Sequence, residues 1–224
     1  MIPWKEWDGV RRLGGLIFDC DGVLFDSYGS NVSYYNAIKA GLGLPPMTPD
    51  EEYVVHVSTV FESIAYIVPR ERLEEALQVR QRLDYNQVAL PHLVPEPGLV
   101  ELLLWLKSQG VRMAVSTNRT TTMEAVLDHF GLAHFFFPVM TAAKVRAKPL
   151  PDAVFKILES WRLSPDEVAF IGDSAVDMRT ARAAGVPFWS YKNFNLAARV
   201  HVPCFWKMRR VLQQAFVGLS NPLV

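Results

Sequence analysis

Residues 13–27 read LGGLIFDCDGVLFDS. The apolar run Leu16–Phe18 has the length and composition of a buried strand. It ends at two carboxylates, Asp19 and Asp21, and Gly22 follows at once. A strand that ends in two acidic side chains and a glycine turn delivers those carboxylates to the edge of a sheet, where a ligand can reach them.

Four more apolar runs of strand length follow and alternate with segments of helical periodicity. The apolar runs are Val111–Val115, Phe135–Met140, Val168–Ile171 and Val186–Trp189. The helical segments are Leu99–Ser108, Thr121–Phe130, Pro151–Trp161 and Ala175–Ala184. Capping-box spacings at Thr121-x-x-Glu124 and Ser164-x-x-Glu167 mark two local starts. This alternation predicts an α/β fold with a Rossmann-like parallel sheet core, covered by helices on both faces.

Residues 27–90 break the alternation, because only helical patterns occur there. We expect helices at Asn31–Ala40, Asp50–Val57, Val60–Val68 and Arg70–Val88. The simplest explanation is a helical cap domain of residues 27–90 inserted after the first strand, with the Rossmann-like core formed by residues 1–26 and 91–224. Short linkers near Phe25–Ser27 and Pro91–Pro97 then serve as hinges. Toward the C-terminus we expect a short strand at Val200–Val202 and a helix at Phe205–Phe216.

Composition restricts the class of partner. Half of the 224 residues, 50%, are hydrophobic, which is enough for a sizeable buried core. Lysine plus arginine equals aspartate plus glutamate at 23 each, so nucleic acid is not expected as a partner. Two cysteines, Cys20 and Cys204, favour a reducing compartment over a disulfide framework. Without a signal-peptide pattern or an apolar run of about 18 residues, we expect a cytoplasmic protein with no membrane partner.

Polar side chains follow four of the predicted strands, and in a parallel sheet these strand ends share one edge. In chain order they are Asp19 and Asp21, then Ser116, Thr117, Asn118 and Arg119, then Lys148, and finally Asp173 and Asp177. Carboxylates held this close repel one another, and Mg²⁺ relieves the repulsion while keeping waters for a substrate phosphate. Hydroxyl, amide and ammonium groups hold phosphate oxygens, so the set predicts phosphoryl transfer.

The segments DCDGVLFDS, STN, KPLPD and GDSAVD, which begin at residues 19, 116, 148 and 172, resemble the four ordered motifs of the haloacid dehalogenase superfamily. The resemblance covers roughly residues 14–190. It is greatest to the branch that is phosphoglycolate phosphatase-like and β-phosphoglucomutase-like, whose members carry a helical cap after the first motif. One such motif is a weak signal, whereas four in order at predicted strand ends form a specific one.

The resemblance implies a role for each matched carboxylate. Asp19 would be the nucleophile that forms an aspartyl-phosphate, and Asp21 would protonate the leaving oxygen and later deprotonate water. The metal ligands for Mg²⁺ would be Asp19, the backbone carbonyl of Asp21, and Asp173. Asp177 would orient a metal-bound water or Lys148.

The remaining matched residues would contact the substrate. Thr117 and Asn118 would bind its phosphate, and Lys148 would pair with Asp19 and the transferred group. The implied function is that of a Mg²⁺-dependent phosphatase for a small phosphomonoester, phosphoglycolate-like or a sugar phosphate, acting as a monomer or homodimer. Asp21 argues against haloacid dehalogenation, which needs no acid to protonate an alkoxide.

Two alternatives stay open at this point. In β-phosphoglucomutase-like members a histidine of the cap follows the first motif, and Asn31 occupies that position here. This departure favours hydrolysis over transfer between sugar hydroxyls without excluding a phosphomutase. The second alternative is a phosphate-binding regulator that has lost turnover. Neither the identity of the substrate nor the role of the Trp189–Val224 tail follows from the sequence.

Overall fold

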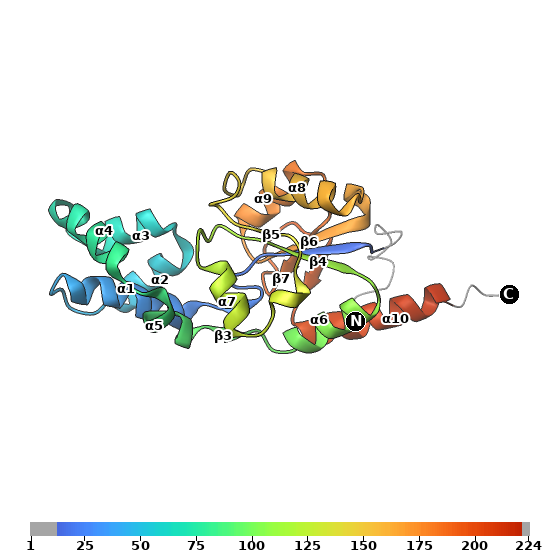
Figure 1. The fold of residues 1–224 in the computed structure, drawn as a ribbon, viewed down its shortest axis with the longest axis horizontal. Coiled ribbons are helices and arrows are strands. Elements are labelled where there is room, and N and C mark those ends of the chain that lie inside the picture. The colour runs from blue at the N-terminus through green and yellow to red at the C-terminus, as the bar shows by residue number, and fades with distance from the viewer. Residues whose placement is uncertain (1–12, 221–224) are drawn as a thin grey trace. The chain divides into compact units, whose positions relative to one another are not determined.

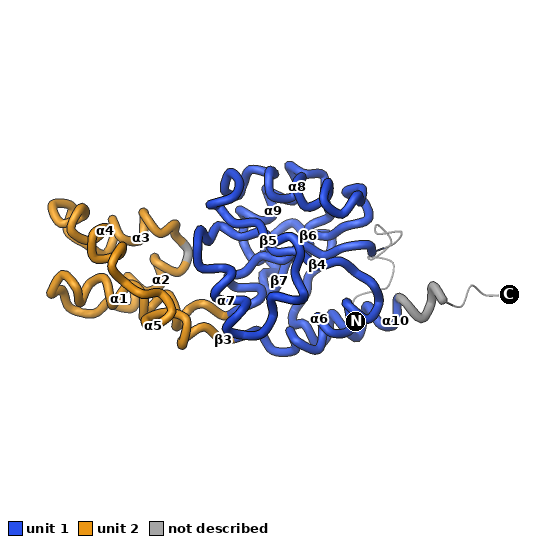
Figure 2. Tube along the Cα trace, in the orientation of Figure 1, with its two compact units in different colours: residues 1–25, 95–224 blue, residues 26–94 orange. Residues whose placement is uncertain are grey.

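The structure is a computed structural model that describes residues 13–220, without the side chains of residue 57 and residues 216–220 (Figure 1). The N-terminal stretch for which we expect no signal peptide therefore lies mostly outside the described residues. Figure 2 shows two compact units, one of residues 1–25 and 95–224 and one of residues 26–94. Within the described range, no helix combines the length and the apolar character that crossing a membrane requires.

The larger unit is built on a six-stranded parallel sheet. From edge to edge, its strands are β5 (Val139–Met140), β4 (Arg112–Ser116), β1 (Gly15–Phe18), β6 (Val168–Gly172), β7 (Phe188–Tyr191) and β8 (Val200–Val202). Every residue of β1 and β6 is buried, as expected for central strands of a sheet covered on both faces. The predicted α/β class with a parallel sheet is confirmed.

Helices cover both faces of this sheet (Figure 1). On one face lie α8 (Asp152–Trp161) and α9 (Ala175–Ala183), and on the other lie α6 (Leu99–Ser108) and α10 (Phe205–Ser220). Ile17 and Trp161 belong to the core cluster beneath α8, and Phe205 of α10 packs against Phe18 and Tyr191 on the opposite face. Burying an aromatic or aliphatic side chain of this size stabilises the fold by about 1.5–3 kcal/mol.

The smaller unit is helical. Its helices are α1 (Tyr28–Gly41), α2 (Pro49–Val57), α3 (Val60–Ile67), α4 (Leu73–Arg82) and α5 (Tyr85–Val88), with 3₁₀ turns η2 (Arg70–Arg72) and η3 (Leu90–His92). The predicted single helix Arg70–Val88 is wrong. Leu83 takes an extended conformation after α4, and the Asp84 side chain accepts a hydrogen bond from the N–H of Asn86 at 2.9 Å, which starts a new helix.

Two expectations for the larger unit are also wrong. The predicted strand Phe135–Met140 is reduced to the two residues of β5, because a 3₁₀ turn, η4 (Ala133–Phe135), occupies its start and Pro138 has no N–H to donate. The predicted capping box at Thr121 does not form, since α7 (Met123–His129) begins after Thr122 and Glu124 pairs with Lys144 instead. The box at Ser164 is present and precedes η5 (Pro165–Glu167).

The two chain segments that connect the units pair with each other. They form the two-stranded sheet of β2 (Phe25–Asp26) and β3 (Val94–Pro95). Directly after β3, the N–H of Glu96 donates to the carbonyl of Leu24 at 2.9 Å. The buried carboxylate of Glu96 accepts hydrogen bonds from Tyr191 at 2.9 Å and from Lys192 at 2.6 Å. The point where the chain re-enters the larger unit is thereby fixed to the end of β7.

Candidate active site

The strand ends that carry the predicted site residues meet at one edge of the sheet. Phe18, the last residue of β1, lies in register with Val115 of β4 and Ile171 of β6. The residues that follow these strands are therefore neighbours, and the N–H of Asp19 donates to the carbonyl of Ile171 at 2.9 Å. Carboxylate oxygens of three of them, Asp19, Asp173 and Asp177, all lie within 4.8 Å of one another.

Lys148 joins two of these carboxylates. Its Nζ lies 2.7 Å from Oδ1 of Asp19 and 2.6 Å from Oδ1 of Asp177, and all three side chains are buried. The loop that presents Lys148 is held by Asn118, whose Oδ1 accepts from the N–H of Lys148 at 2.8 Å and whose Nδ2 donates to its carbonyl at 3.2 Å. The amide of Asn118 therefore positions Lys148, which the sequence reasoning did not foresee.

The turn after β1 needs a glycine. The carbonyl of Cys20 accepts hydrogen bonds from the N–H groups of Leu24 and Phe25 at 2.9 and 3.1 Å, so the chain doubles back at once. Gly22 has φ +73°, and a Cβ built on it would lie 2.1 Å from Oδ2 of Asp173. Both the left-handed conformation and the close approach of Asp173 exclude a larger residue. Cys20 itself is fully buried, which raises the pKa of its thiol and disfavours a nucleophilic role.

The cluster carries more negative charge than its one ammonium compensates. Burial and then the charge of Asp177 raise the pKa of Asp19 well above its ordinary value, although Lys148 acts in the opposite direction. Burial and the same Asp177 charge raise the pKa of Asp173 to about 7. Burial alone would lower the pKa of Lys148, but the charges of Asp177 and Asp19 outweigh it and raise that pKa above its usual range. The carboxylates thus favour any added cation.

The donor set fits a hard divalent cation. With every group ionised, the three carboxylates and one ammonium leave a deficit of two positive charges, which equals the charge of one Mg²⁺. The three carboxylates offer oxygen ligands, which Mg²⁺ prefers. Asp177 is the least available of them, because its Oδ1 binds Lys148 and its Oδ2 accepts from the hydroxyl of Ser174 at 2.5 Å. Asp19 and Asp173 are the better candidates for metal ligands.

Asp19 is held so that one oxygen stays open. Its Oδ1 accepts from the N–H of Cys20 at 2.6 Å and from Lys148 at 2.7 Å. Within residues 13–220, its Oδ2 has no hydrogen-bond donor. The hydrogen bonds to Oδ1 fix the carboxylate in place, while Oδ2 remains available to attack an electrophile.

Asp21 lies outside this cluster and has a cation of its own. Arg119 donates from Nε to Oδ2 of Asp21 at 2.8 Å and from Nη2 to Oδ1 at 2.6 Å. From the sequence, Arg119 is expected only as one of the polar residues that follow the strands. Its position directly after the Ser116-Thr117-Asn118 segment, at a strand end next to that of the two aspartates, was the available signal. Thr117 is buried beside it, and its Oγ1 accepts from the N–H of Arg119 at 3.1 Å.

Two further residues support the carboxylates. Ser174 is the N-cap of α9 and forms a capping box with Asp177, which fixes the Asp177 side chain at the start of that helix. The spacing Ser174-x-x-Asp177 is the sequence signal for this box. Asn193, just after β7, donates from Nδ2 to the carbonyl of Asp173 at 2.9 Å. No local pattern marks Asn193, because its partner comes from another strand end.

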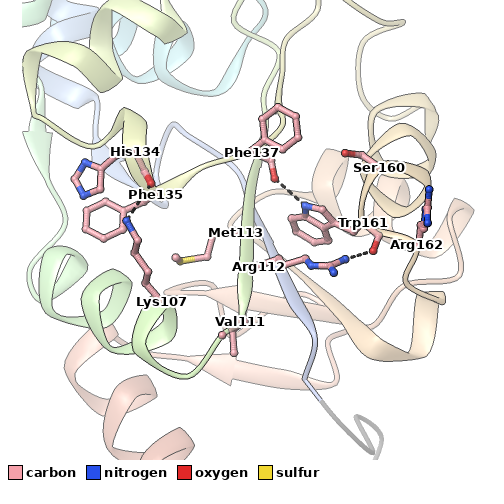
Figure 3. Close-up of a pocket in the computed structure, with 11 residues that line it drawn as sticks. Lys107, Val111, Arg112, Met113, His134, Phe135, Phe137, Ser160, Trp161 and Arg162 are labelled. Carbon is pink, nitrogen blue, oxygen red and sulfur yellow. Dashed lines mark hydrogen bonds between the residues drawn. The ribbon is translucent and has the colours of Figure 1, made fainter.

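A cavity of about 650 Å³ lies elsewhere in the larger unit (Figure 3). It is lined by the start of β4 at Arg112, by the end of α8 at Trp161 and Arg162, and by Phe135 and Phe137. Arg112 is the first residue of β4, whereas the polar site residues follow its last residue, Ser116. The cavity therefore opens at the amino end of the strands and includes none of the clustered carboxylates, so the chemistry does not lie there.

Comparisons with known proteins point to one family. A family model described as haloacid dehalogenase-like hydrolase matches residues 16–190. Phosphoglycolate phosphatase 1 of Pseudomonas aeruginosa is 29% identical over an alignment of 187 residues that covers 79% of this chain and 69% of that protein. A phosphoglycolate phosphatase of Chromobacterium violaceum is 30% identical over 79% of this chain and 83% of its own length. The crystal structure of a subfamily IA, variant 1, haloacid dehalogenase-superfamily hydrolase from Geobacter sulfurreducens superposes with a TM-score of 0.80 and 35% identity, over 89% of this chain and 96% of that one.

Proposed function

The chain belongs to the haloacid dehalogenase-like hydrolase family, in which it is a phosphoric monoester hydrolase, and we propose that it is a Mg²⁺-dependent phosphatase for a small phosphomonoester such as phosphoglycolate. The observation that carries the proposal is the pairing of an anchored Asp19, with one open oxygen, and a separate carboxyl, Asp21, two residues later. One group attacks phosphorus and the other moves a proton. Relatives named phosphoglycolate phosphatase support the substrate class.

The reaction proceeds in two displacements. Oδ2 of Asp19 attacks phosphorus, the bond from phosphorus to the leaving oxygen breaks, and that oxygen takes a proton from Asp21. Water then attacks the aspartyl-phosphate, Asp21 takes the proton of the water, and the bond from phosphorus to Asp19 breaks. This returns both carboxyls to their starting states and releases inorganic phosphate.

The other residues hold charge and position. Lys148 offsets negative charge beside Asp19, and Thr117 and Asn118 would hold the phosphate oxygens. Asp19, Asp173 and the carbonyl of Asp21 would hold Mg²⁺, which when bound supplies positive charge at the phosphate. Asp177 keeps Lys148 in place, as its 2.6 Å ion pair supports.

The proposal is tested by phosphate release. Purified protein with Mg²⁺ is expected to release phosphate from 4-nitrophenyl phosphate and from some members of a panel of phosphorylated metabolites that includes 2-phosphoglycolate, and EDTA is expected to stop it. No release from any ester in the panel would contradict the proposal. Exchange between sugar-phosphate isomers without release would point to the phosphomutase instead.

Mg²⁺ should stabilise the protein more at pH 8 than at pH 5.5. Because the folded pKa of Asp173 is raised to about 7, this carboxyl is more protonated in the metal-free folded state than in the unfolded chain between about pH 4 and 7, and its contribution to stability falls as pH rises through that range. A bound divalent cation stabilises the ionised carboxylates and competes with protons. At about 100 times its Kd, Mg²⁺ adds about 2.7 kcal/mol, which corresponds to a rise of about 5–10 °C in Tm.

We expect less than half of that rise at pH 5.5, measured by thermal unfolding in Mg²⁺ and in EDTA. Asp173→Asn should remove most of the Mg²⁺ effect at pH 8. Asp166→Asn, at an exposed position of η5, is the matched control and should retain the effect. Equal Mg²⁺ shifts at both pH values would refute the assignment of the metal to this cluster.

A further inference from the structure

Arg119 has no part in the displacement steps above, yet it forms an ion pair with Asp21. Both oxygens of Asp21 accept from the guanidinium, at 2.8 and 2.6 Å. The side chain of Arg119 is 10% exposed and that of Asp21 is 38% exposed. A two-point pair between a planar guanidinium and a planar carboxylate fixes the plane of the carboxylate, which a single ammonium does not do.

Arg119 is itself anchored to the loop after β4. Its N–H donates to Oγ1 of Thr117, its carbonyl accepts from the N–H of Ala142 at 2.9 Å, and its Nη1 donates to Oγ1 of Thr122 at 3.4 Å. Asp21 and Arg119 are 98 positions apart in the chain. Arg119 thus ties the orientation of Asp21 to the strand end where the proposed phosphate-binding residue Thr117 lies.

The two cations of the site pair with different carboxylates. Lys148 pairs with Asp19 and Asp177, whereas Arg119 pairs with Asp21. The two bonds from Arg119 reach both oxygens of Asp21, so the guanidinium sets the direction of this carboxyl group.

We propose that Arg119 is a positioning residue that holds Asp21 in the orientation from which it protonates the leaving oxygen. The proposal rests on the proposed phosphatase function. In the step concerned, the bond from Asp19 to phosphorus forms, the bond to the leaving oxygen breaks with its electron pair on that oxygen, and the proton of Asp21 passes to it. An ester whose leaving group is stable as an anion needs this proton little, and an ester with a basic leaving group needs it greatly.

The test compares two aryl esters of the same shape class, phenyl phosphate and 4-nitrophenyl phosphate. The quantity measured is kcat/KM, because it reports the formation of the aspartyl-phosphate and not its later hydrolysis. General acid catalysis contributes about 10²–10⁴-fold. In Arg119→Met we expect kcat/KM to fall about 10²-fold for phenyl phosphate and less than about 5-fold for 4-nitrophenyl phosphate.

Two more variants separate positioning from charge and from folding. Arg119→Lys keeps a positive charge without the two-point geometry and should show the same selective loss for phenyl phosphate. Arg146→Met is the matched control, because Arg146 also donates from Nε to an aspartate, Asp152, at 2.7 Å but is 71% exposed. We expect it to leave both kcat/KM values within about 2-fold of wild type, since such surface pairs contribute about 0–1 kcal/mol.

Equal losses for the two esters in Arg119→Met would overturn the proposal, because Arg119 would then bind phosphate or support the fold. No loss for either ester would overturn it as well. Full recovery in Arg119→Lys would show that charge and not geometry matters, and would also overturn it. These outcomes differ from a failure of the proposed function, in which the wild-type protein releases phosphate from neither ester.

Discussion

Replacing Asp19 by asparagine should abolish phosphate release and leave the metal-free protein at least as stable as wild type. Turnover should fall at least about 10³-fold, because the amide lacks the anionic oxygen that attacks phosphorus. Stability should not fall, because burial and the charge of Asp177 disfavour the ionised form of Asp19, and a neutral side chain of the same shape relieves that repulsion. The measurements are phosphate release with Mg²⁺ and Tm in EDTA at pH 8.

The matched control for this variant is Asp128→Asn, which removes a carboxylate from an exposed position on α7. Exposed substitutions away from a site change stability by at most about 0.5 kcal/mol, so this variant should stay folded. Its turnover should therefore remain within about 2-fold of wild type. A turnover of Asp19→Asn close to that of the control would remove Asp19 from the role of nucleophile.

Replacing Lys148 by methionine should lower activity and stability together, in contrast to Asp19→Asn. Lys148 is buried and pairs with Asp19 at 2.7 Å and Asp177 at 2.6 Å, so its removal leaves two buried carboxylates without their shared cation. Breaking a buried ion pair in this way costs about 3–5 kcal/mol. Loss of a charge that stabilises the transition state should also lower kcat by at least about 10²-fold. Urea unfolding at pH 8 and phosphate release measure the two effects.

The control for Lys148 is Lys144→Met. Lys144 also pairs with a carboxylate, Glu124, at 2.6 Å, but both side chains are about half exposed. Removal of such a surface pair should change the free energy of unfolding by about 0–1 kcal/mol and leave kcat unchanged. If Lys148→Met were as stable and as active as this control, the charge balance assigned to the cluster would be wrong.

The parallel sheet explains how the sequence predicts that residues distant in the chain lie at one edge. Apolar runs specify β1, β4 and β6, and parallel pairing forces the residues after these strands to one edge, as the register of Phe18 with Val115 and Ile171 shows. The approach of Asp19 and Asp173 then follows from topology, because each directly follows a strand. Their chemical roles stay predictions that the variants above address.

The features that the sequence does not predict depend on contacts between distant segments, or on a side chain that starts a new helix where the helical pattern continues. The pair of Asp21 with Arg119 joins residues 98 positions apart, and no periodicity encodes which cation a carboxylate meets. The side chain of Asn118 holds the backbone of Lys148, which a motif read as phosphate-binding does not reveal. Within the smaller unit, Asp84 starts a new helix where helical periodicity alone continues the old one.

We expect Asp19 to carry the phosphoryl group during turnover. Asp21→Asn should slow the hydrolysis of the aspartyl-phosphate while still allowing 4-nitrophenyl phosphate to phosphorylate Asp19, since this ester has a good leaving group. The deciding measurement is mass spectrometry of peptides from Asp21→Asn that is mixed with Mg²⁺ and 4-nitrophenyl phosphate and quenched in acid. We expect an acid-stable, base-labile phosphoryl group on Asp19. A phosphoryl group on another residue, or none while wild-type protein turns over, would contradict it.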